Sequence, residues 1–432
     1  MSPIEIGIIG VIAVFVLLFM GMPIALALIL VGVIGTWQIA SLGAALPVVA
    51  RTLYQTASHY PYMVIPMFII MGGFAASTGM VGKLYGTFEI WLRKLPGGLG
   101  AATIAACAAF SAVSGSSVAT SAAMGTIAYP EMEKFDYSPK LSTGAIAAGG
   151  TLGFLIPPSI GFVVYGMLTE QSIGELLIAG VIPGILLTAV FIAIIVFMVK
   201  RNPSLAPPVE KDATLKEKII SIKGVWEILL IFLVVMGGIY LGWFSPNEAG
   251  AVGATALLLV ALVKRKLTLN NLFSALRETV RVSTMVLFLV AGASVFTYFL
   301  AISTIPTELA QYVAGLDVSR YMILVIILLV YFFLGMFIDA ISMMVLTMPV
   351  VFPMIIELGF DPIFFGVICV LMMQVGLITP PMGLNLYTIA GTTKVDLNQI
   401  FLGALPFIFP VFIVVALIII FPGIATFLPS LM

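Results

Sequence analysis

The stretch Ser114-Gly115-Ser116-Ser117 brings hydroxyl groups and a glycine together inside an otherwise apolar part of the chain. Gly115 permits a tight turn that exposes backbone carbonyls. Hydroxyl and carbonyl oxygens are the hard ligands that a Na⁺ ion needs when it sheds water inside a membrane. Serines in membrane helices also bond the preceding turn or allow close packing. Alone, this stretch is therefore compatible with a sodium site and with a purely structural tip.

A carboxylate lies in a second apolar run, Phe337-Ile338-Asp339-Ala340-Ile341-Ser342. When the chain is shifted by 223 residues, Asp339 coincides with Ser116. A carboxylate at membrane depth is costly and is by default a functional residue. Asp339 is therefore a candidate Na⁺ ligand or proton carrier. The structural alternative is a hydrogen bond that holds the turn.

Two proline pairs interrupt apolar segments, at Ile156-Pro157-Pro158-Ser159 and at Thr379-Pro380-Pro381-Met382. A proline ring removes a backbone donor and breaks a helix. The half-helices beyond each pair are expected to point their positive N-terminal ends into the membrane centre, which favours an anionic solute there. Thr151 and Gln374 coincide under the 223-residue shift and are expected to occupy equivalent deep positions.

The two proline pairs belong to a wider repeat. The same shift aligns Pro23 with Pro246, Pro130 with Pro353, Pro139 with Pro362, Pro157 with Pro380, Pro158 with Pro381, and Pro183 with Pro406. Composition alone would give about one such coincidence, so the pattern indicates a duplication. Paired interruptions in two hydrophobic repeats point to the binding site of a secondary transporter.

Composition sets the class of protein. Hydrophobic residues make up 62% of the chain and charged residues 9%, and the mean hydropathy is +1.23, as in a polytopic membrane protein. No Gly-x-x-x-x-Gly-Lys-Ser/Thr motif occurs, so nucleotide-driven transport by this chain is not expected. The tip serines have no nearby histidine or lysine as a base, so the chain is not expected to be an enzyme. The start lacks a basic region, and the first apolar run is expected to remain as a membrane helix.

Hydropathy divides the chain into a first repeat (1–199), a cytoplasmic linker (200–224) and a second repeat (225–432). In the first repeat we expect helices near 4–20, 23–40, 62–80 and 175–199, a span of 140–156 and 160–169 broken at 157–158, and arms at 99–113 and 118–129. The arms are too short to cross a core that needs about 20 helical residues. They predict a re-entrant hairpin with its tip at 114–117.

The second repeat has the same order. We expect helices near 226–243, 246–263, 283–301 and 400–421, a hairpin with its tip near 335–342, and a span broken at 380–381. The fold class is thus an all-α polytopic membrane protein with five crossings and one re-entrant hairpin in each repeat. Because five is odd, the repeats are expected to be inverted in the membrane.

Positive charge orients this arrangement. With the linker in the cytoplasm, only Arg51 and Arg320 of the 19 Lys and Arg residues fall outside. Both termini are then periplasmic, and the two hairpins enter from opposite faces so that their tips meet near the midplane. Ser41 and His59 are expected in an outer loop.

These residues occur together in a known family. The tip 114–117, the segment Gly149-Gly150-Thr151-Leu152-Gly153 with Pro157-Pro158-Ser159, Asp339, and Thr379-Pro380-Pro381 with Gly383 and Asn385 resemble the large, DctM-like membrane subunit of tripartite ATP-independent periplasmic (TRAP) transporters, in the ion transporter superfamily. The likeness covers essentially the whole chain.

The resemblance implies a Na⁺-coupled importer in the bacterial inner membrane, working by an elevator mechanism in which a transport domain with two hairpins slides through a fixed scaffold. It also implies two partners. One is a small four-helix membrane subunit on a separate chain. The other is a periplasmic binding protein that delivers a carboxylate such as a C4-dicarboxylate or a sialic acid. The coupling ion is Na⁺, and no organic cofactor is expected. The alternative is a stand-alone elevator-fold divalent-anion symporter or ion antiporter that needs no binding protein.

The resemblance also assigns candidate sites. A first Na⁺ site between the first tip and the first break would involve Ser114, Gly115, Ser116, Ser117, Gly150, Thr151, Gly153 and Pro157. A second Na⁺ site would involve Gly335, Asp339, Ser342, Thr379, Pro380, Gly383 and Asn385. Candidates to face the substrate are Ser116, Thr151, Pro158, Ser159, Gln374 and Pro381.

Overall fold

The computed structural model describes residues 1–207 and 213–432, and within these ranges it contains helices and no strand. The first half comprises α1 (Pro3–Phe19), α2 (Ile24–Ile39), α3 (Leu42–Ser58), η1 (Tyr60–Met63), α4 (Val64–Ser77), α5 (Met80–Leu92), α6 (Gly98–Ser114), α7 (Ser117–Lys134), α8 (Pro139–Thr151), η2 (Leu152–Phe154), α9 (Ile160–Thr169), α10 (Ile173–Ala179), α11 (Val181–Arg201) and η3 (Pro203–Leu205). The all-helical architecture agrees with the prediction.

The second half repeats this order of helices. It comprises α12 (Leu215–Ser221), η4 (Ile222–Gly224), α13 (Trp226–Tyr240), α14 (Pro246–Val263), α15 (Leu269–Ser303), α16 (Ile305–Ala314), α17 (Arg320–Gly335), α18 (Ala340–Glu357), α19 (Pro362–Leu377), α20 (Leu384–Thr393), α21 (Leu397–Ala404), η5 (Leu405–Phe407), α22 (Ile408–Ile420), α23 (Gly423–Thr426) and η6 (Pro429–Leu431). Pro139 and Pro362 are the first residues of α8 and α19, where the N–H that proline lacks would have no carbonyl partner within the helix. The peptide bond within each proline pair is cis.

The structure corrects the loop expected around Ser41 and His59, and it adds helix before 283, where none was expected. Residues 42–58 form α3, so Ser41 is the N-cap of a helix, and α15 runs unbroken for 35 residues from Leu269. The short helix α16 is a further addition. These segments are amphipathic; in α3 only Ala45 and Thr56 are buried. A search for long, uniformly apolar runs misses a helix that carries one polar face.

Several helices can cross a membrane by length and composition. Within the described part of the chain there are six, or seven if the pair Leu215–Gly224 and Trp226–Tyr240, bent by 58°, counts as one span. Helices α1 and α2 are apolar but have only 17 and 16 residues, whereas the hairpin arm α18 passes the same test. The multi-pass character is confirmed, and the count of five crossings per half stays a prediction.

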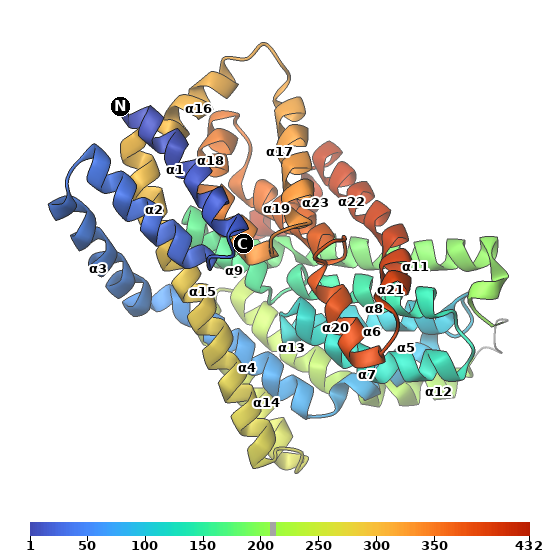
Figure 1. Ribbon diagram of the computed structural model, residues 1–432. Coiled ribbons are helices and arrows are strands. Elements are labelled where there is room, and N and C mark those ends of the chain that lie inside the picture. Colours follow the sequence, from blue (N-terminus) through green and yellow to red (C-terminus); the bar gives the residue numbers. More distant parts are fainter. Residues whose placement is uncertain (208–212) are drawn as a thin grey trace.

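Helices from the two halves pack on one another in a reciprocal way. Helix α2 lies along α15, and α14 lies along α4, which is visible in the left and lower parts of Figure 1. The backbones come close because Gly292 has no side chain; a methyl group there would lie 2.8 Å from the Ala25 carbonyl oxygen. The hairpins and broken helices contact one another, α7 on α8 and α20, and α17 on α19, while the arm α18 packs most closely on α16. The helices that carry the predicted sites therefore form a cluster beside α2, α4, α14 and α15.

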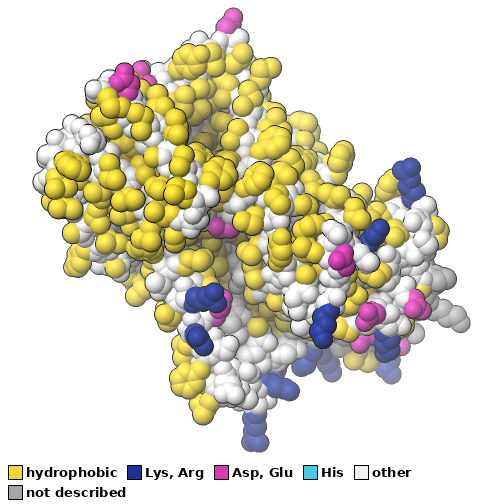
Figure 2. All heavy atoms as spheres, viewed as in Figure 1, with side chains coloured by type: hydrophobic (Ala, Val, Ile, Leu, Met, Phe, Trp, Pro, Cys, Tyr) yellow, Lys and Arg dark blue, Asp and Glu magenta, His cyan; other side chains and the backbone are white. Residues whose placement is uncertain are grey.

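Charge is distributed unevenly over the surface. On the face shown in Figure 2, Lys and Arg side chains gather in the lower and right-hand parts of the view, whereas acidic side chains lie both in the upper part and among the basic ones at the lower right. Separation of basic residues to one end is the pattern that the positive-inside rule describes.

Candidate functional site

The first tip is built by two helix ends that face each other. Helix α6 ends at Gly115, whose φ of 62° lies in the left-handed region that favours glycine, and its N–H bonds the Ser111 carbonyl at 3.1 Å. Ser116 then caps α7, because its hydroxyl accepts from the Ala119 N–H at 3.3 Å. This pair of local constraints turns the chain sharply at the predicted place.

The first break lies directly against this tip. A methyl group on Gly153 would lie 2.7 Å from the Ser116 carbonyl oxygen, and one on Gly115 would meet the Pro158 carbonyl. Among the hydroxyls nearby, Thr151 donates to the Ala148 carbonyl at 2.7 Å and is thus occupied within its own helix. The structure brings the first tip and the first break into backbone contact.

Polar side chains at the break also serve the backbone. Ser159 donates to the Phe154 carbonyl at 2.5 Å and accepts from the Phe162 N–H at 3.4 Å, so it is the N-cap of α9. A capped helix that begins beside the tip directs its positive end toward it. Ser159 thus holds the half-helix in place, and its hydroxyl is already used.

Asn385 lies where the sequence does not place it. Its side chain is fully buried against the first tip, with the Ser117 hydroxyl donating to Oδ1 at 3.0 Å and accepting from Nδ2 at 2.8 Å. The same Nδ2 is 3.5 Å from the Ala147 carbonyl on α8. The assignment of Asn385 to the second site stays a prediction, and the structure places its side chain against the first tip, because α20 packs on α7 and Ser117 precedes it by 268 positions in the chain.

Several buried polar atoms on the helices of the tips and breaks have no hydrogen-bond partner within the described chain. They are the hydroxyls of Ser111, Ser114 and Ser121 and both amide atoms of Gln374. An unpaired buried polar group costs about 1–3 kcal/mol, so such atoms are suited to receive an ion or a solute. The sequence search missed Ser121, although it stands one helical turn after Ser117 and shares its face. A methyl group on Gly150 would meet the Ser121 hydroxyl.

The second tip and the second break also meet. A methyl group on Gly376 would lie 2.5 Å from the Gly335 carbonyl oxygen, and the Met382 N–H donates to the Met336 carbonyl at 3.1 Å. Thr379 donates to the Val375 carbonyl at 2.5 Å. The second tip is thus held by backbone contacts, as the first is.

Asp339 is the N-cap of α18. Its Oδ1 accepts from the Ser342 N–H at 3.1 Å, in the position that Ser116 occupies on α7. The side chain is exposed to a cavity of about 490 Å³, which Pro23, Gly383 and Tyr387 also line. Asp339 therefore makes the structural hydrogen bond and keeps carboxylate oxygen directed to open space.

A second cavity, of about 720 Å³, lies beside the first tip. It is lined by Ser114 and Ser116 and, among others, by Gly72 and Gly73 of α4 and by Asn271, Ser274 and Glu278 of α15. The α15 residues escaped the sequence search because they lie in a segment for which no helix was expected. A methyl group on Gly72 would lie 2.6 Å from the Ser114 carbonyl oxygen, so α4 and the tip are in close contact.

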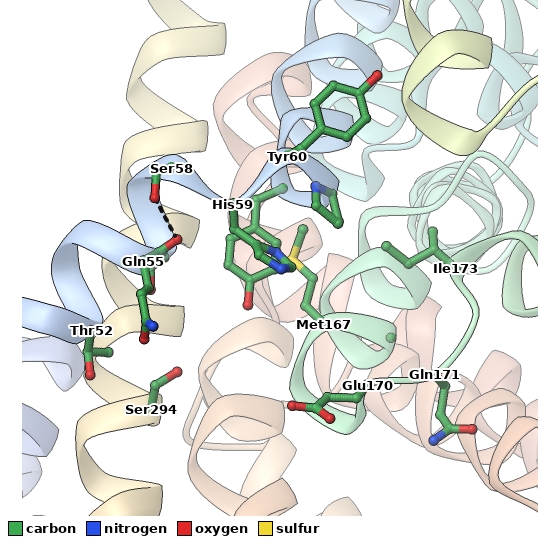
Figure 3. Close-up of a pocket in the computed structure, with 14 residues that line it drawn as sticks. Thr52, Gln55, Ser58, His59, Tyr60, Met167, Glu170, Gln171, Ile173 and Ser294 are labelled. Atoms are coloured by element: carbon green, nitrogen blue, oxygen red, sulfur yellow. Dashed lines mark hydrogen bonds between the residues drawn. The ribbon is translucent and has the colours of Figure 1, made fainter. Parts of the chain in front are cut away.

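A third cavity, of about 890 Å³, contains none of the predicted site residues (Figure 3). Its lining includes Gln55 and His59 from one side and Glu170 and Gln171 from the α9–α10 connection. The His59 ring packs edge-on against Tyr62 with centroids 4.7 Å apart. His59 therefore lines this cavity and packs against a neighbouring aromatic ring.

The described residues include no group of three or more His, Cys, Asp or Glu side chains able to hold a metal ion. The oxygen atoms at the tips are hydroxyls, amides, carbonyls and a single carboxylate, which is a donor set for a hard monovalent cation. The polar atoms gathered at the tips thus fit Na⁺.

Comparisons with known proteins agree on one family. A family model described as the tripartite ATP-independent periplasmic transporter, DctM component, matches residues 11–424. The C4-dicarboxylate TRAP transporter large permease protein DctM of Pseudomonas aeruginosa is 36% identical over 383 residues, covering 88% of this chain and 89% of the relative. The sialic acid TRAP transporter large permease protein SiaM of Vibrio cholerae is 32% identical over 416 residues, covering 96% of each.

A solved structure shares the fold. It is the Alcanivorax borkumensis YdaH transporter, described as having an unusual topology, with a TM-score of 0.60 and 15% sequence identity over 88% of this chain and 89% of that one. At this identity the likeness concerns the fold alone.

Proposed function

The chain belongs to the family of the DctM component of tripartite ATP-independent periplasmic transporters, and from this premise we propose that it is the permease that moves an organic anion inward across the inner membrane in symport with Na⁺. It is a multi-pass membrane protein of a solute transporter. Its family is one of transporters and not of enzymes.

The proposed solute is a carboxylate. Relatives named for C4-dicarboxylate and for sialic acid support this, because both compounds are organic anions at neutral pH, although other relatives are named for isethionate and for ectoine. The helices α9 and α20 begin at the two breaks with their positive ends directed at the tips, which supports an anion between them. Gln374, a buried amide with both polar atoms unpaired, is the proposed donor to that anion.

The observation that carries the Na⁺ proposal is the contact between Ser117 and Asn385. It joins oxygen atoms from both halves of the chain at a fully buried point, beside the unpaired hydroxyls of Ser114 and Ser121. A cation there would complete the coordination of atoms that otherwise lack partners. We therefore assign Asn385 to the first Na⁺ site. Asp339 remains the proposed ligand of the second.

The proposed mechanism is an elevator. The two hairpins and broken helices would move as one body against α2, α4, α14 and α15, within two repeats of opposite orientation and with both termini periplasmic. Support comes from the lack of a side chain at Gly72, which faces the first tip across the contact between these groups and leaves a smooth surface for sliding. The repeated helix order in the two halves supports the duplication.

Membership of the family favours a tripartite assembly over the stand-alone symporter. The proposed partners are a small membrane subunit on a separate chain and a periplasmic binding protein that delivers the solute. Uptake with and without the binding protein distinguishes the two arrangements, since a stand-alone symporter would work without it.

The test of Na⁺ coupling uses proteoliposomes that contain the permease with its small subunit and receive loaded binding protein. Uptake is expected to require an inward Na⁺ gradient and no ATP. Uptake that persists undiminished without Na⁺, at fixed potential and pH, refutes the coupling.

The elevator itself is tested by thiol labelling. A cysteine at Ser116, in a background without Cys107 and Cys369, is expected to change its accessibility when Na⁺ and loaded binding protein are added, and one at Ser41 is not. Labelling of Ser116→Cys from one side only, equal in every condition, would favour a fixed site.

A further inference from the structure

Helix α15 is too long for the membrane core. Its 35 residues extend about 52 Å at 1.5 Å per residue, against a core of about 30 Å. The uniformly apolar part begins near residue 283, so the first turns, 269–282, extend beyond the core into the headgroup layer. A polar and charged surface is expected there.

The two sides of this segment differ. Ala275 and Thr279 are buried against the protein, whereas Phe273 and Val280 are 66% and 64% exposed. The exposed side is an open, shallow surface formed by Phe273, Leu276, Arg277, Val280 and Arg281. Two arginines one helical turn apart therefore lie among apolar side chains on the outward surface, and Figure 2 shows dark-blue side chains among yellow ones near the lower end of α15.

In the part of the chain that the structure describes, these two guanidinium groups have no acidic partner. Within the described residues Arg277 and Arg281 form no ion pair, although the nearby Lys264 is paired with Glu227. Glu278 lines the cavity beside the first tip and so belongs to another side of the helix. Like charges at positions i and i+4 repel each other, and an anion between them removes the repulsion.

The apolar surface continues from the arginines toward the core. Met285 and Phe288, on the following turns, are 50% and 38% exposed. A ligand that fits this arrangement has an anionic phosphate at one end and hydrocarbon at the other.

From this arrangement we propose that the outward side of α15 binds an anionic phospholipid, with the phosphodiester held between Arg277 and Arg281 and the acyl chains lying along Met285 and Phe288. A guanidinium binds phosphate oxygens in a bidentate manner, and basic clusters at a membrane boundary attract anionic lipids. Free phosphate shares the charge but gains nothing from the apolar surface.

The test is native mass spectrometry of the purified full chain with phosphatidylglycerol, cardiolipin and phosphatidylcholine of matched acyl chains. We expect the anionic lipids to bind preferentially, and the variant R277Q/R281Q to lose about fivefold in affinity for each arginine removed. The matched control K200Q/R201Q, which removes two exposed charges at the end of α11, is expected to keep wild-type affinity.

Three results would overturn the proposal: equal affinity of R277Q/R281Q and wild type for the anionic lipids, equal binding of phosphatidylcholine and anionic lipids to the wild type, or complete displacement of lipid by millimolar inorganic phosphate. Loss of the small subunit from R277Q/R281Q with unchanged lipid affinity would assign the surface to a protein partner instead. Melting in phosphatidylcholine alone verifies the fold. The single variants R277Q and R281Q, each expected to lose about fivefold, replace the double variant if it does not fold.

Discussion

Replacing Asn385 by alanine tests the first ion site most directly. The change removes Oδ1 and Nδ2, which lie 3.0 and 2.8 Å from the Ser117 hydroxyl, at a fully buried position. A hydrogen bond to a charged group contributes about 1.5–3 kcal/mol, and a lost ion ligand is of the same order. At about 1.4 kcal/mol per factor of ten, the apparent affinity for Na⁺ is expected to fall by about 10- to 150-fold.

Two measurements check this expectation. The first is the Na⁺ concentration that half-saturates uptake in proteoliposomes, and the second is the rise in melting temperature with NaCl compared with KCl at equal ionic strength. Asn398→Ala is the control, because that asparagine is exposed on α21. A double-mutant cycle with Ser117→Ala is expected to give a coupling energy of about 0.5–3 kcal/mol.

The reasoning fails if Asn385→Ala folds normally and its half-saturating Na⁺ concentration stays within about twofold of wild type. Then the contact with Ser117 only joins two helices. A fall in stability of about 1–3 kcal/mol with unchanged Na⁺ dependence would also refute the ion site, because it measures the lost hydrogen bonds alone.

Three further changes address the other parts of the site. Asp339→Asn keeps a side-chain acceptor for the cap of α18, so the free energy of unfolding should change by less than about 0.5 kcal/mol while uptake loses its Na⁺ dependence. Gross instability with normal Na⁺ dependence would make the residue structural. Gly72→Ala places a methyl group 2.6 Å from the Ser114 carbonyl oxygen, so it should lower the free energy of unfolding by about 1–3 kcal/mol and slow uptake. The control Gly82→Ala has open space around it and should do neither. Equal uptake in both variants contradicts a tight sliding contact. Gln374→Met removes a buried amide that has no partner within the described residues, so thermal unfolding should show a free energy of unfolding about 1–3 kcal/mol higher while transport is lost. Wild-type transport would exclude the amide from solute binding.

The arms and breaks could be predicted because they depend on local chemistry. Gly115 ends α6 since it adopts a positive φ, and Ser116 and Asp339 begin α7 and α18 since each caps its helix. Pro157 and Pro380 stand at the breaks because proline cannot continue a helix. Each of these constraints acts within a few residues and is therefore visible in the sequence.

The amphipathic helices could not be predicted from the same signals. Helix α3 and the first turns of α15 mix polar and apolar residues, as loops near a membrane surface do. They become helices because one side packs on neighbouring helices, α3 on α2 and α15 on α2, α3 and α4. That packing depends on segments far away in the chain.

By itself the sequence determined the membrane class, the repeated order of segments, and the residues at the tips and breaks, since hydropathy, proline, glycine and capping side chains act locally. Only the tertiary structure decided which of these residues meet. It directs Asn385 to Ser117 across 268 residues, leaves Ser121 and Gln374 buried without partners, and turns Asp339 toward a cavity. Such contacts follow from how whole helices pack, and no local pattern of residues specifies that packing.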